Sequence, residues 1–290
     1  MAKPLIENVS DTALWVATYR AVESSRPDAL FRDPLAARLA GEKGKVIANR
    51  VDRSRFVAWQ VVIRTAIIDR FILEHVKNGV DMVVNLGAGL DTRPYRLDLP
   101  PSLKWVEVDF PRIIDLKEKE LASDKPKCNL ERIRVDLSDP EASKKCFAEL
   151  ATRAKNILLI TEGVVPYLTN AQVAELASNL YAHPSFRYWI CEYMSSFVVN
   201  YLQKNRNKHM GNAPFQFVPL DWNDFFKEKG WQIKETNYIP AEALKWKRPI
   251  PLPWWTKILL RWFAPKKRKE AFLKSTGYHV FEKIPMKFAL

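Results

Sequence analysis

Val83-Val84-Asn85-Leu86-Gly87-Ala88-Gly89-Leu90-Asp91-Thr92-Arg93 is the stretch from which the fold prediction starts. A short apolar run ends abruptly at Gly-Ala-Gly, and a polar, turn-forming segment follows. The apolar run is typical of a strand that is buried on both faces. Two glycines one residue apart favour a tight turn at which another molecule approaches the backbone closely. We therefore expect a nucleoside-bearing cofactor at this turn.

The composition is that of a folded protein with a strong positive charge. The 290 residues are 47% apolar and 12% aromatic, which excludes a disordered chain, and the formal charge of +13 raises nucleic acid, anionic membranes and acidic substrates as partners. Three isolated cysteines form no CxxC pair, which argues against a disulfide framework or a metal cluster. We see no signal peptide and no run long enough to span a membrane, and we expect a cytoplasmic protein.

Further strands and helices alternate along the chain. Helical patterns occupy residues 10–40, with breaks at the prolines and an end near Gly41, and residues 54–77. Strands are predicted at 82–86, 104–109, 132–135, 156–160, 187–192, 230–235 and 278–282, most of them separated by helical segments. This alternation predicts right-handed βαβ units and a parallel sheet. We expect a single domain over residues 1–290, which consists of a helical cap (1–78), a cofactor-binding core (80–193), a substrate lid region (194–275) and a final strand (276–290).

Acidic residues follow the glycine turn at the ends of successive predicted strands. Asp109 ends the second strand, where a carboxylate can accept hydrogen bonds from both hydroxyls of a ribose. Asp136 ends the third strand and can accept from the amine of adenine, with Leu137 against the ring; a solvated helix-capping carboxylate is the alternative. The third position of a dinucleotide fingerprint is Thr92 rather than glycine. A cofactor without a phosphate needs no close helix start, and S-adenosylmethionine is one, with its methionine carboxylate meeting a cation such as Arg64.

The segment 85–97, Asn-Leu-Gly-Ala-Gly-Leu-Asp-Thr-Arg-Pro-Tyr-Arg-Leu, resembles the signature of the leucine carboxyl methyltransferase family. It is most similar to the bacterial branch of S-adenosylmethionine-dependent methyltransferases linked to polyketide O-methylation. Segments 12–36, 107–111 (Glu-Val-Asp-Phe-Pro) and 160–168 (Ile-Thr-Glu-Gly-Val-Val-Pro-Tyr-Leu) resemble the family's cap, second-strand motif and fourth-strand motif.

The resemblance implies a class I methyltransferase (Rossmann-like) α/β fold with a seven-stranded, mostly parallel sheet and helices on both faces. A helical N-terminal cap and a lid insertion before the last strand would complete it. The implied cofactor is S-adenosyl-L-methionine. The residues that we expect to bind it are Arg64, Gly87, Ala88, Gly89, Asp91, Asp109, Asp136, Leu137 and Glu162.

The expected reaction is O-methylation of a carboxylate or hydroxyl on a small, lipophilic molecule. A carboxylate acceptor needs no general base, whereas a phenol or alcohol does, and His209, His279 and Tyr167 are then the candidates. We assign no catalytic residue and no metal. An NAD(P)-dependent oxidoreductase and a non-catalytic, basic membrane-surface adaptor remain alternatives. Nucleic-acid methylation is not expected, because Thr161-Glu162-Gly163 replaces the Asn/Asp-Pro-Pro-Tyr motif of adenine-amine methyltransferases.

The segment from Lys245 to Lys274 is the most basic part of the chain. It carries ten basic residues and one acid, Glu270, and therefore +9 of the net +13. Its tryptophans, Trp254, Trp255 and Trp262, are predicted to share one helical face with Ile258, Leu259 and Phe263. Such a segment suits a lid over the active site, peripheral contact with an anionic membrane, or both.

Overall fold

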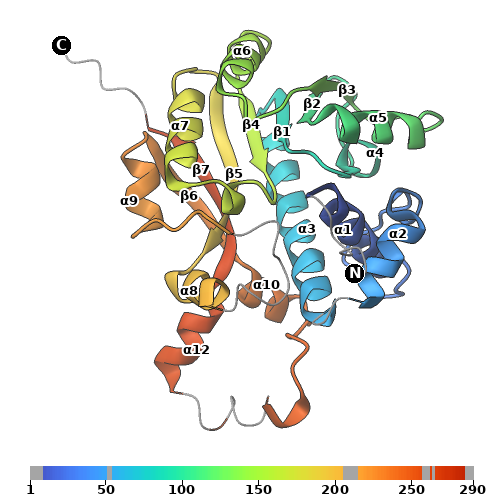
Figure 1. Cartoon of the computed structure of the whole chain (residues 1–290), viewed down its shortest axis with the longest axis vertical. Coiled ribbons are helices and arrows are strands. Elements are labelled where there is room, and N and C mark those ends of the chain that lie inside the picture. The colour runs from blue at the N-terminus through green and yellow to red at the C-terminus, as the bar shows by residue number, and fades with distance from the viewer. Residues whose placement is uncertain (1–8, 51–53, 205–214, 257–261, 263–264, 285–290) are drawn as a thin grey trace, which may run out of the picture.

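The computed structural model describes residues 9–50, 54–204, 215–256, 262 and 265–284, and its centre is a seven-stranded sheet (Figure 1). The strand order is β3-β2-β1-β4-β5-β7-β6. The strands are β1 (Met82–Leu86), β2 (Lys104–Asp109), β3 (Asn129–Arg134), β4 (Ile157–Thr161), β5 (Phe186–Met194), β6 (Trp231–Tyr238) and β7 (Thr276–Lys283).

The first five strands run parallel to their neighbours, and β7 runs antiparallel between β5 and β6. Strand β2 lies on one side of β1 and β4 lies on the other, so the strand order reverses at β1. In an open α/β sheet, ligands bind beyond the carboxyl ends of the strands at such a switch point. The predicted mostly parallel, seven-stranded α/β sheet is confirmed.

Alternate side chains of the central strands pack into two hydrophobic layers. Met82, Val84 and Leu86 of β1 face α6 (Pro140–Ala151), α7 (Asn170–Tyr181) and α9 (Trp222–Lys227). Val83 faces the opposite layer, which α3 (Ser54–Lys77) and α10 (Ile239–Lys245) form. Because β1 is buried on both faces, its sequence is a nearly continuous apolar run.

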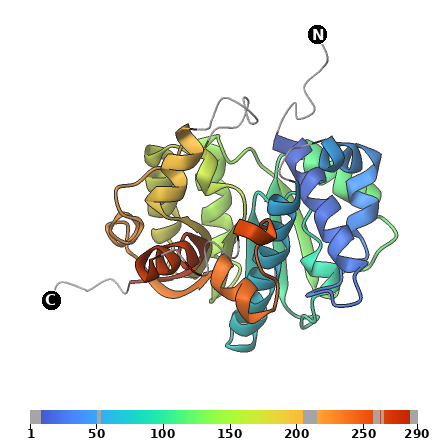
Figure 2. The same cartoon turned by 90° about the horizontal axis from the view of Figure 1, so that it is seen from below.

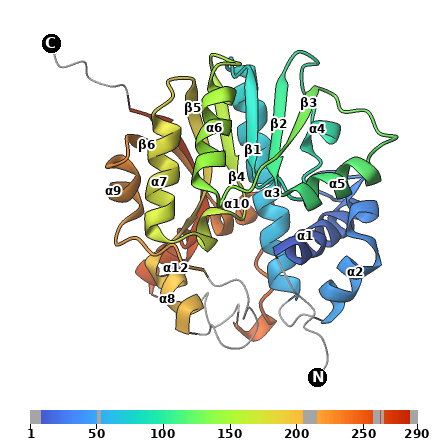
Figure 3. The same ribbon diagram turned by 45° about the horizontal axis from the view of Figure 1, so that its top comes forward.

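The remaining helices are α1 (Val9–Ser24), α2 (Ala36–Arg50), α4 (Arg93–Arg96), α5 (Pro111–Glu120), η1 (Val165–Tyr167), α8 (Ser196–Lys204) and α12 (Lys266–Leu273). Of these, α1, α2, α8 and α12 lie at one end of the sheet. Figure 3 shows α1 and α2 on one side of this end and α8 and α12 on the other. From below, α3 lies between the two groups (Figure 2). The space between them lies beyond the carboxyl ends of β1, β4 and β5.

Two local predictions differ from the structure. The helix expected to end near Gly41 resumes after it: Gly41 has φ 56°, so it kinks α2, which continues to Arg50. The third strand begins at Asn129, three residues before the predicted start, because its pairing with β2 rather than its apolar content sets its length. Helices α8 and α10 lie within the expected lid region, as do α9 and β6, which belong to the core.

Candidate functional site

The glycine turn after β1 requires glycine at two positions. Gly87 has φ +69°, and a Cβ there would lie 2.5 Å from Val164 Cγ2. Gly89 has φ +49°, a conformation that side-chain-bearing residues rarely adopt. The backbone N–H of Gly87 donates to the Val108 carbonyl of β2 at 2.8 Å, which fixes the turn against the sheet. The turn therefore brings bare backbone to the end of the sheet, as the sequence predicted.

Asp109 links the turn to the second strand. One carboxylate oxygen accepts from the Gly89 N–H at 2.6 Å, and the other accepts from the Phe110 N–H at 2.7 Å. Burial raises the pKa of Asp109, and these two backbone N–H groups oppose the shift. Each oxygen keeps a lone pair for a further donor. Asp109 is thus held in place where it can accept from a ribose.

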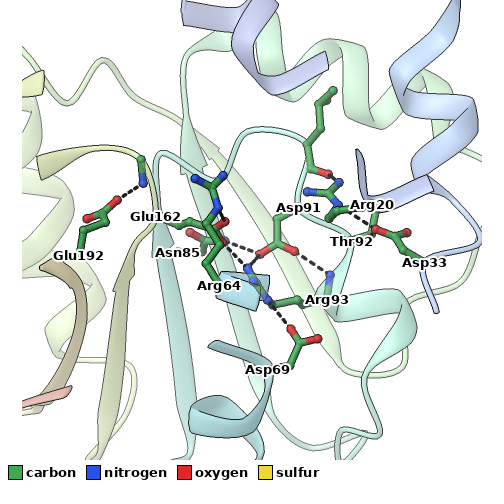
Figure 4. A network of polar contacts seen from close by, with 12 residues as sticks. Arg20, Asp33, Arg64, Asp69, Asn85, Asp91, Thr92, Arg93, Glu162 and Glu192 are labelled. Atoms are coloured by element: carbon green, nitrogen blue, oxygen red, sulfur yellow. Dashed lines mark hydrogen bonds and ion pairs between the residues drawn. The ribbon is translucent and has the colours of Figure 1, made fainter. Parts of the chain in front are cut away.

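A buried network of alternating charges surrounds the end of β4 (Figure 4). Glu162 lies 2.9 Å from the Nε of Arg64 and 2.8 Å from an Nη of Arg93. Arg93 also contacts Asp69 and Asp91, each at 2.7 Å. Burial alone would raise the pKa of Glu162, but Arg93 and Arg64 outweigh it and lower that pKa. Glu162 is therefore an anion that two arginines hold in place.

Asp91 shapes the turn from inside this network. Its carboxylate accepts from the Asn85 side chain at 2.8 Å and from the backbone N–H of Arg93 at 2.9 Å. Burial opposes ionisation, but Arg93 and Lys117 outweigh it and hold the pKa of Asp91 well below its usual range. Asp91 faces the cavity, but these contacts make it chiefly a support for the turn.

The N-terminal helices are fastened to the same turn. Arg20 of α1 lies 2.9 Å from Asp33 and also donates to the Leu90 carbonyl. Asp33 in turn accepts from the Thr92 hydroxyl at 2.7 Å (Figure 4). Because these side chains are buried, the pairing fixes the position of the cap over the turn.

The end of β3 places Leu137 and Asp136 differently. Leu137 is half-buried and faces the cavity, as expected for a residue that packs against adenine. Asp136 is exposed, is not among the cavity-lining residues, and accepts from the Ser138 N–H at 2.8 Å and from its hydroxyl at 2.6 Å. It is therefore a solvated carboxylate at the strand end that forms a local turn, whereas Asp139 caps the helix that follows. Its contact with a cofactor stays a prediction.

A cavity of about 2400 Å³ joins these residues to the lid region. One end is lined by residues of the predicted cofactor site: Arg64, Gly87, Ala88, Gly89, Asp91, Asp109, Leu137 and Glu162. The other end is mostly apolar and includes Val16, Trp59, Phe197, Phe215, Ile250 and Phe272. Eight of the nine predicted cofactor residues therefore meet in one space that continues into an apolar chamber.

Glu192 is a cavity-lining carboxyl that the sequence analysis did not single out. It follows Cys191 in β5, and Cys191 pairs with Thr161 of β4, so Glu192 and Glu162 lie at neighbouring strand ends. One oxygen accepts from the backbone N–H groups of Gly163 and Val164, and Figure 4 draws one of these two contacts. Burial raises the pKa of Glu192 to about 7, although the Gly163 N–H opposes the shift. Asp109 and Glu162 were selected because they are acids at the ends of predicted strands. The same criterion, applied to the predicted strand 187–192, would also have selected Glu192.

The three candidate bases fare differently. His279 is buried within β7, contacts the Thr236 hydroxyl at 2.8 Å and does not line the cavity; burial lowers its pKa to about 4. Tyr167 lines the cavity, and burial raises its pKa. His209 lies outside the described residues. Of His279 and Tyr167, only Tyr167 faces the space where an acceptor would bind.

The leucine carboxyl methyltransferase family model matches residues 13–181. The chain belongs to this family. The matched region contains the N-terminal cap, the glycine turn and the end of β4, so the predicted family is confirmed on the segments that suggested it. Membership does not favour the oxidoreductase alternative.

Two curated relatives of the chain are named as methyltransferases. A Mycobacteroides abscessus protein named "Putative S-adenosyl-L-methionine-dependent methyltransferase" is 32% identical over 194 residues, which cover 61% of this chain and 61% of that protein. The chain thus matches less than two thirds of that relative's length. A second protein of the same name and organism is 26% identical over 275 residues, which cover 85% of this chain and 90% of that protein.

A solved structure has the same fold. A "putative methyltransferase" from Thermobifida fusca superimposes with a TM-score of 0.57 at 15% identity, covering 93% of this chain and 94% of that one. At this identity the likeness concerns the fold alone.

Proposed function

We propose that this chain binds S-adenosyl-L-methionine and transfers its methyl group to a hydroxyl of a lipophilic small molecule. The observation that carries the proposal is the single cavity, which has the family's cofactor residues at one end and apolar side chains at the other. An apolar chamber with few polar groups selects an apolar ligand and orients it through those groups.

The residues present fit the cofactor. The Nε of Arg64 lies 2.9 Å from Glu162 and is buried, but it donates no hydrogen bond of good geometry. The guanidinium of Arg64 can therefore still bind the carboxylate of a cofactor. The bare backbone of Gly87 and Gly89 leaves room for a ligand, and Asp109 offers lone pairs to a ribose. When bound, the cofactor supplies an activated methyl group. The chain mainly has to align the acceptor and exclude water.

Glu192 supports a hydroxyl acceptor. Its two backbone contacts engage one carboxylate oxygen, Oε1. The other oxygen, Oε2, accepts only from the weak S–H donor of Cys191 at 3.9 Å and is therefore the freer atom. A carboxyl with a pKa near 7 can take a proton at neutral pH without holding it too tightly. In this proposal the O–H bond of the acceptor breaks and its proton moves to Glu192. The acceptor oxygen would take the methyl group from the bound cofactor, whose methyl carbon–sulfur bond would break with its electron pair passing to sulfur, which leaves the neutral thioether S-adenosylhomocysteine.

A carboxylate acceptor is the second candidate, because the family is named for carboxyl methylation. Such an acceptor is already ionised and needs no base. An ionised Glu192 would repel it, so the carboxyl would have to be protonated during the reaction. The two candidates therefore differ in what Glu192 must do.

Two measurements test the proposal. Calorimetry with S-adenosylhomocysteine and NADH should detect only the former; binding of NADH alone would contradict methyl transfer. Radiolabelled cofactor should then be incubated with 4-octylphenol, 1-dodecanol or dodecanoic acid, and the organic extract treated with alkali. A methyl ether survives alkali, whereas a methyl ester releases labelled methanol. Label confined to alkali-labile product would favour the carboxylate candidate over the hydroxyl one.

A further inference from the structure

We propose that the chain docks on anionic lipid bilayers through a face formed by Trp254, Trp255, Trp262 and the basic start of α12, which we call the aromatic–basic face. The proposal concerns lipid binding, which requires neither cofactor nor acceptor, and so it can fail or succeed independently of the proposed function. Among the described residues, no helix is long and apolar enough to cross a bilayer. The inferred contact is therefore peripheral.

The aromatic part of this face is unusually exposed. The exposed fractions of Trp254 and Trp262 are 75% and 74%, and Trp255 is 54% exposed. Other tryptophans, such as Trp105, Trp189 and Trp231, are fully buried. Tryptophan favours the boundary between water and lipid, where its ring meets acyl chains and its N–H stays hydrated. Three exposed tryptophans within nine residues thus suit a bilayer surface.

The basic part carries charge that the chain does not neutralise. Helix α12 begins Lys266-Lys267-Arg268-Lys269, and the structure shows no ion pair from Lys266, Lys267 or Arg268 to any residue that it describes. By contrast, Lys245 and Arg248 of the same basic segment pair with acidic residues. The start of α12 therefore presents three consecutive cations without an ion pair to the described residues.

Helix α12 also gains little stability from the rest of the chain. None of its eight residues is buried, and its first turn has no acidic residue and no side-chain cap. Cations in the first turn oppose the helix dipole, and a short helix gains little stability on its own. Anionic headgroups would neutralise the cations of the first turn, and lysines beside such a surface contribute favourably to lipid binding.

The cavity opens beside this face. Its lining includes Phe197 and Leu244, which are 75% and 57% exposed, together with Arg268, Lys269 and Phe272 of α12. In Figure 1, α12 and the segment that leads to residue 256 both extend from the lower end of the molecule. A lipophilic molecule could thus pass from a bilayer into the apolar chamber without crossing water.

Vesicle flotation tests the docking. Phosphatidylcholine vesicles with and without phosphatidylglycerol are compared at low and high salt, with the full chain and no cofactor. We expect retention only on the anionic vesicles, with loss at high salt because the attraction is screened. Equal retention on both vesicle types, or none on either, would overturn the proposal.

Two variants locate the contact. The double variant K266E/K267E should lower the partition coefficient roughly 30-fold, since each lysine near an anionic surface contributes about a factor of five. K119E/K125E makes the same charge change at exposed sites on and after α5, away from α12, and should change it less than three-fold. Unchanged S-adenosylhomocysteine affinity and circular dichroism show that both variants are folded. Equal losses from the two variants would mean that net charge, not this face, binds lipid.

The tryptophans supply an independent readout. Brominated lipids should quench wild-type fluorescence, and W254S/W255S should lose most of that quenching together with part of the binding. Single-stranded RNA is the competing occupant, since it also meets cations and aromatic rings. RNA binding that is tighter than vesicle binding and equally sensitive to K266E/K267E would assign the face to nucleic acid and overturn the lipid proposal.

Discussion

Glu162 and Glu192 lie near the ends of neighbouring strands, line the same cavity and are both buried, but they differ in the charged groups beside them. Glu162 lies against Arg64 and Arg93, which lower its pKa. Glu192 accepts from two backbone N–H groups and from the weak S–H donor of Cys191 at 3.9 Å, and it forms no ion pair with any residue that the structure describes; burial raises its pKa to about 7. Two carboxyls whose surroundings push their pKa values apart can serve different roles in one site. In the function that we propose, Glu162 at the end of β4 helps to hold the ligand and Glu192 of β5 exchanges a proton.

The largest expected effect is that of the variant Glu192→Gln on the rate of methyl transfer. With a hydroxyl acceptor, loss of the base should lower kcat by about 10²- to 10⁴-fold, while S-adenosylhomocysteine affinity stays within two-fold. The amide oxygen of glutamine can still accept from the Gly163 N–H, so the local fold should persist. Methyl transfer is measured with 4-octylphenol across pH 5–9, where the wild-type rate should rise through a pKa near 7 and the variant's should not. An unchanged rate would remove Glu192 from the proton transfer.

The variant Arg93→Met removes the buried ion pairs that surround Glu162. Loss of Arg93 leaves Asp69, Asp91 and Glu162 without their shared cation in a buried site. Breaking a buried pair in this way costs about 3–5 kcal/mol of unfolding free energy. Urea denaturation measures the loss.

Arg134→Met is the matched control for this variant. Arg134 pairs with Asp115 and Glu118, but these side chains are exposed and their attraction is screened by water, so we expect a much smaller loss of stability than in Arg93→Met. Similar losses from the two arginines would show that the network around Glu162 is not held together by its buried ion pairs.

The pH dependence of stability separates the two glutamates without any acceptor. Glu192 binds a proton more tightly in the folded state, where its pKa is about 7 against a usual value of 4.5. Its stabilising contribution is therefore fully present below pH 4.5 and is lost as the pH rises through about 7. The loss is on the order of 3 kcal/mol. It should be absent from Glu192→Gln, so the difference between the two unfolding free energies should grow between pH 4.5 and 8; parallel curves would contradict the raised pKa.

The parts of the site that a local pattern encodes were predictable from the sequence. The glycine turn, Asp109 and Glu162 follow apolar strands directly, and parallel pairing must bring them to one edge. The raised pKa of Glu192 depends instead chiefly on its burial, which only the tertiary structure fixes. Asp136 shows the same limit, because the nearby Ser138 engages its carboxylate. The predicted aromatic helix face includes Ile258, Leu259 and Phe263, which lie outside the described residues.

The smallest expected effect concerns the turn that faces both glutamates. In Gly87→Ala, a methyl group would meet Val164 Cγ2 at 2.5 Å, and the positive φ costs about 1–2 kcal/mol. In Gly79→Ala, φ is +94° but no atom lies within 4 Å, so only backbone strain is added. Gly87→Ala should lose more stability in urea than Gly79→Ala, because it adds the clash with Val164 to the backbone strain. It alone should also weaken S-adenosylhomocysteine binding, by about ten-fold if the turn and Val164 shift by a few tenths of an ångström. If both bind equally well, the close approach of Val164 to Gly87 has no part in shaping the cofactor end, and the distinction between the strand ends rests on the two carboxyls alone.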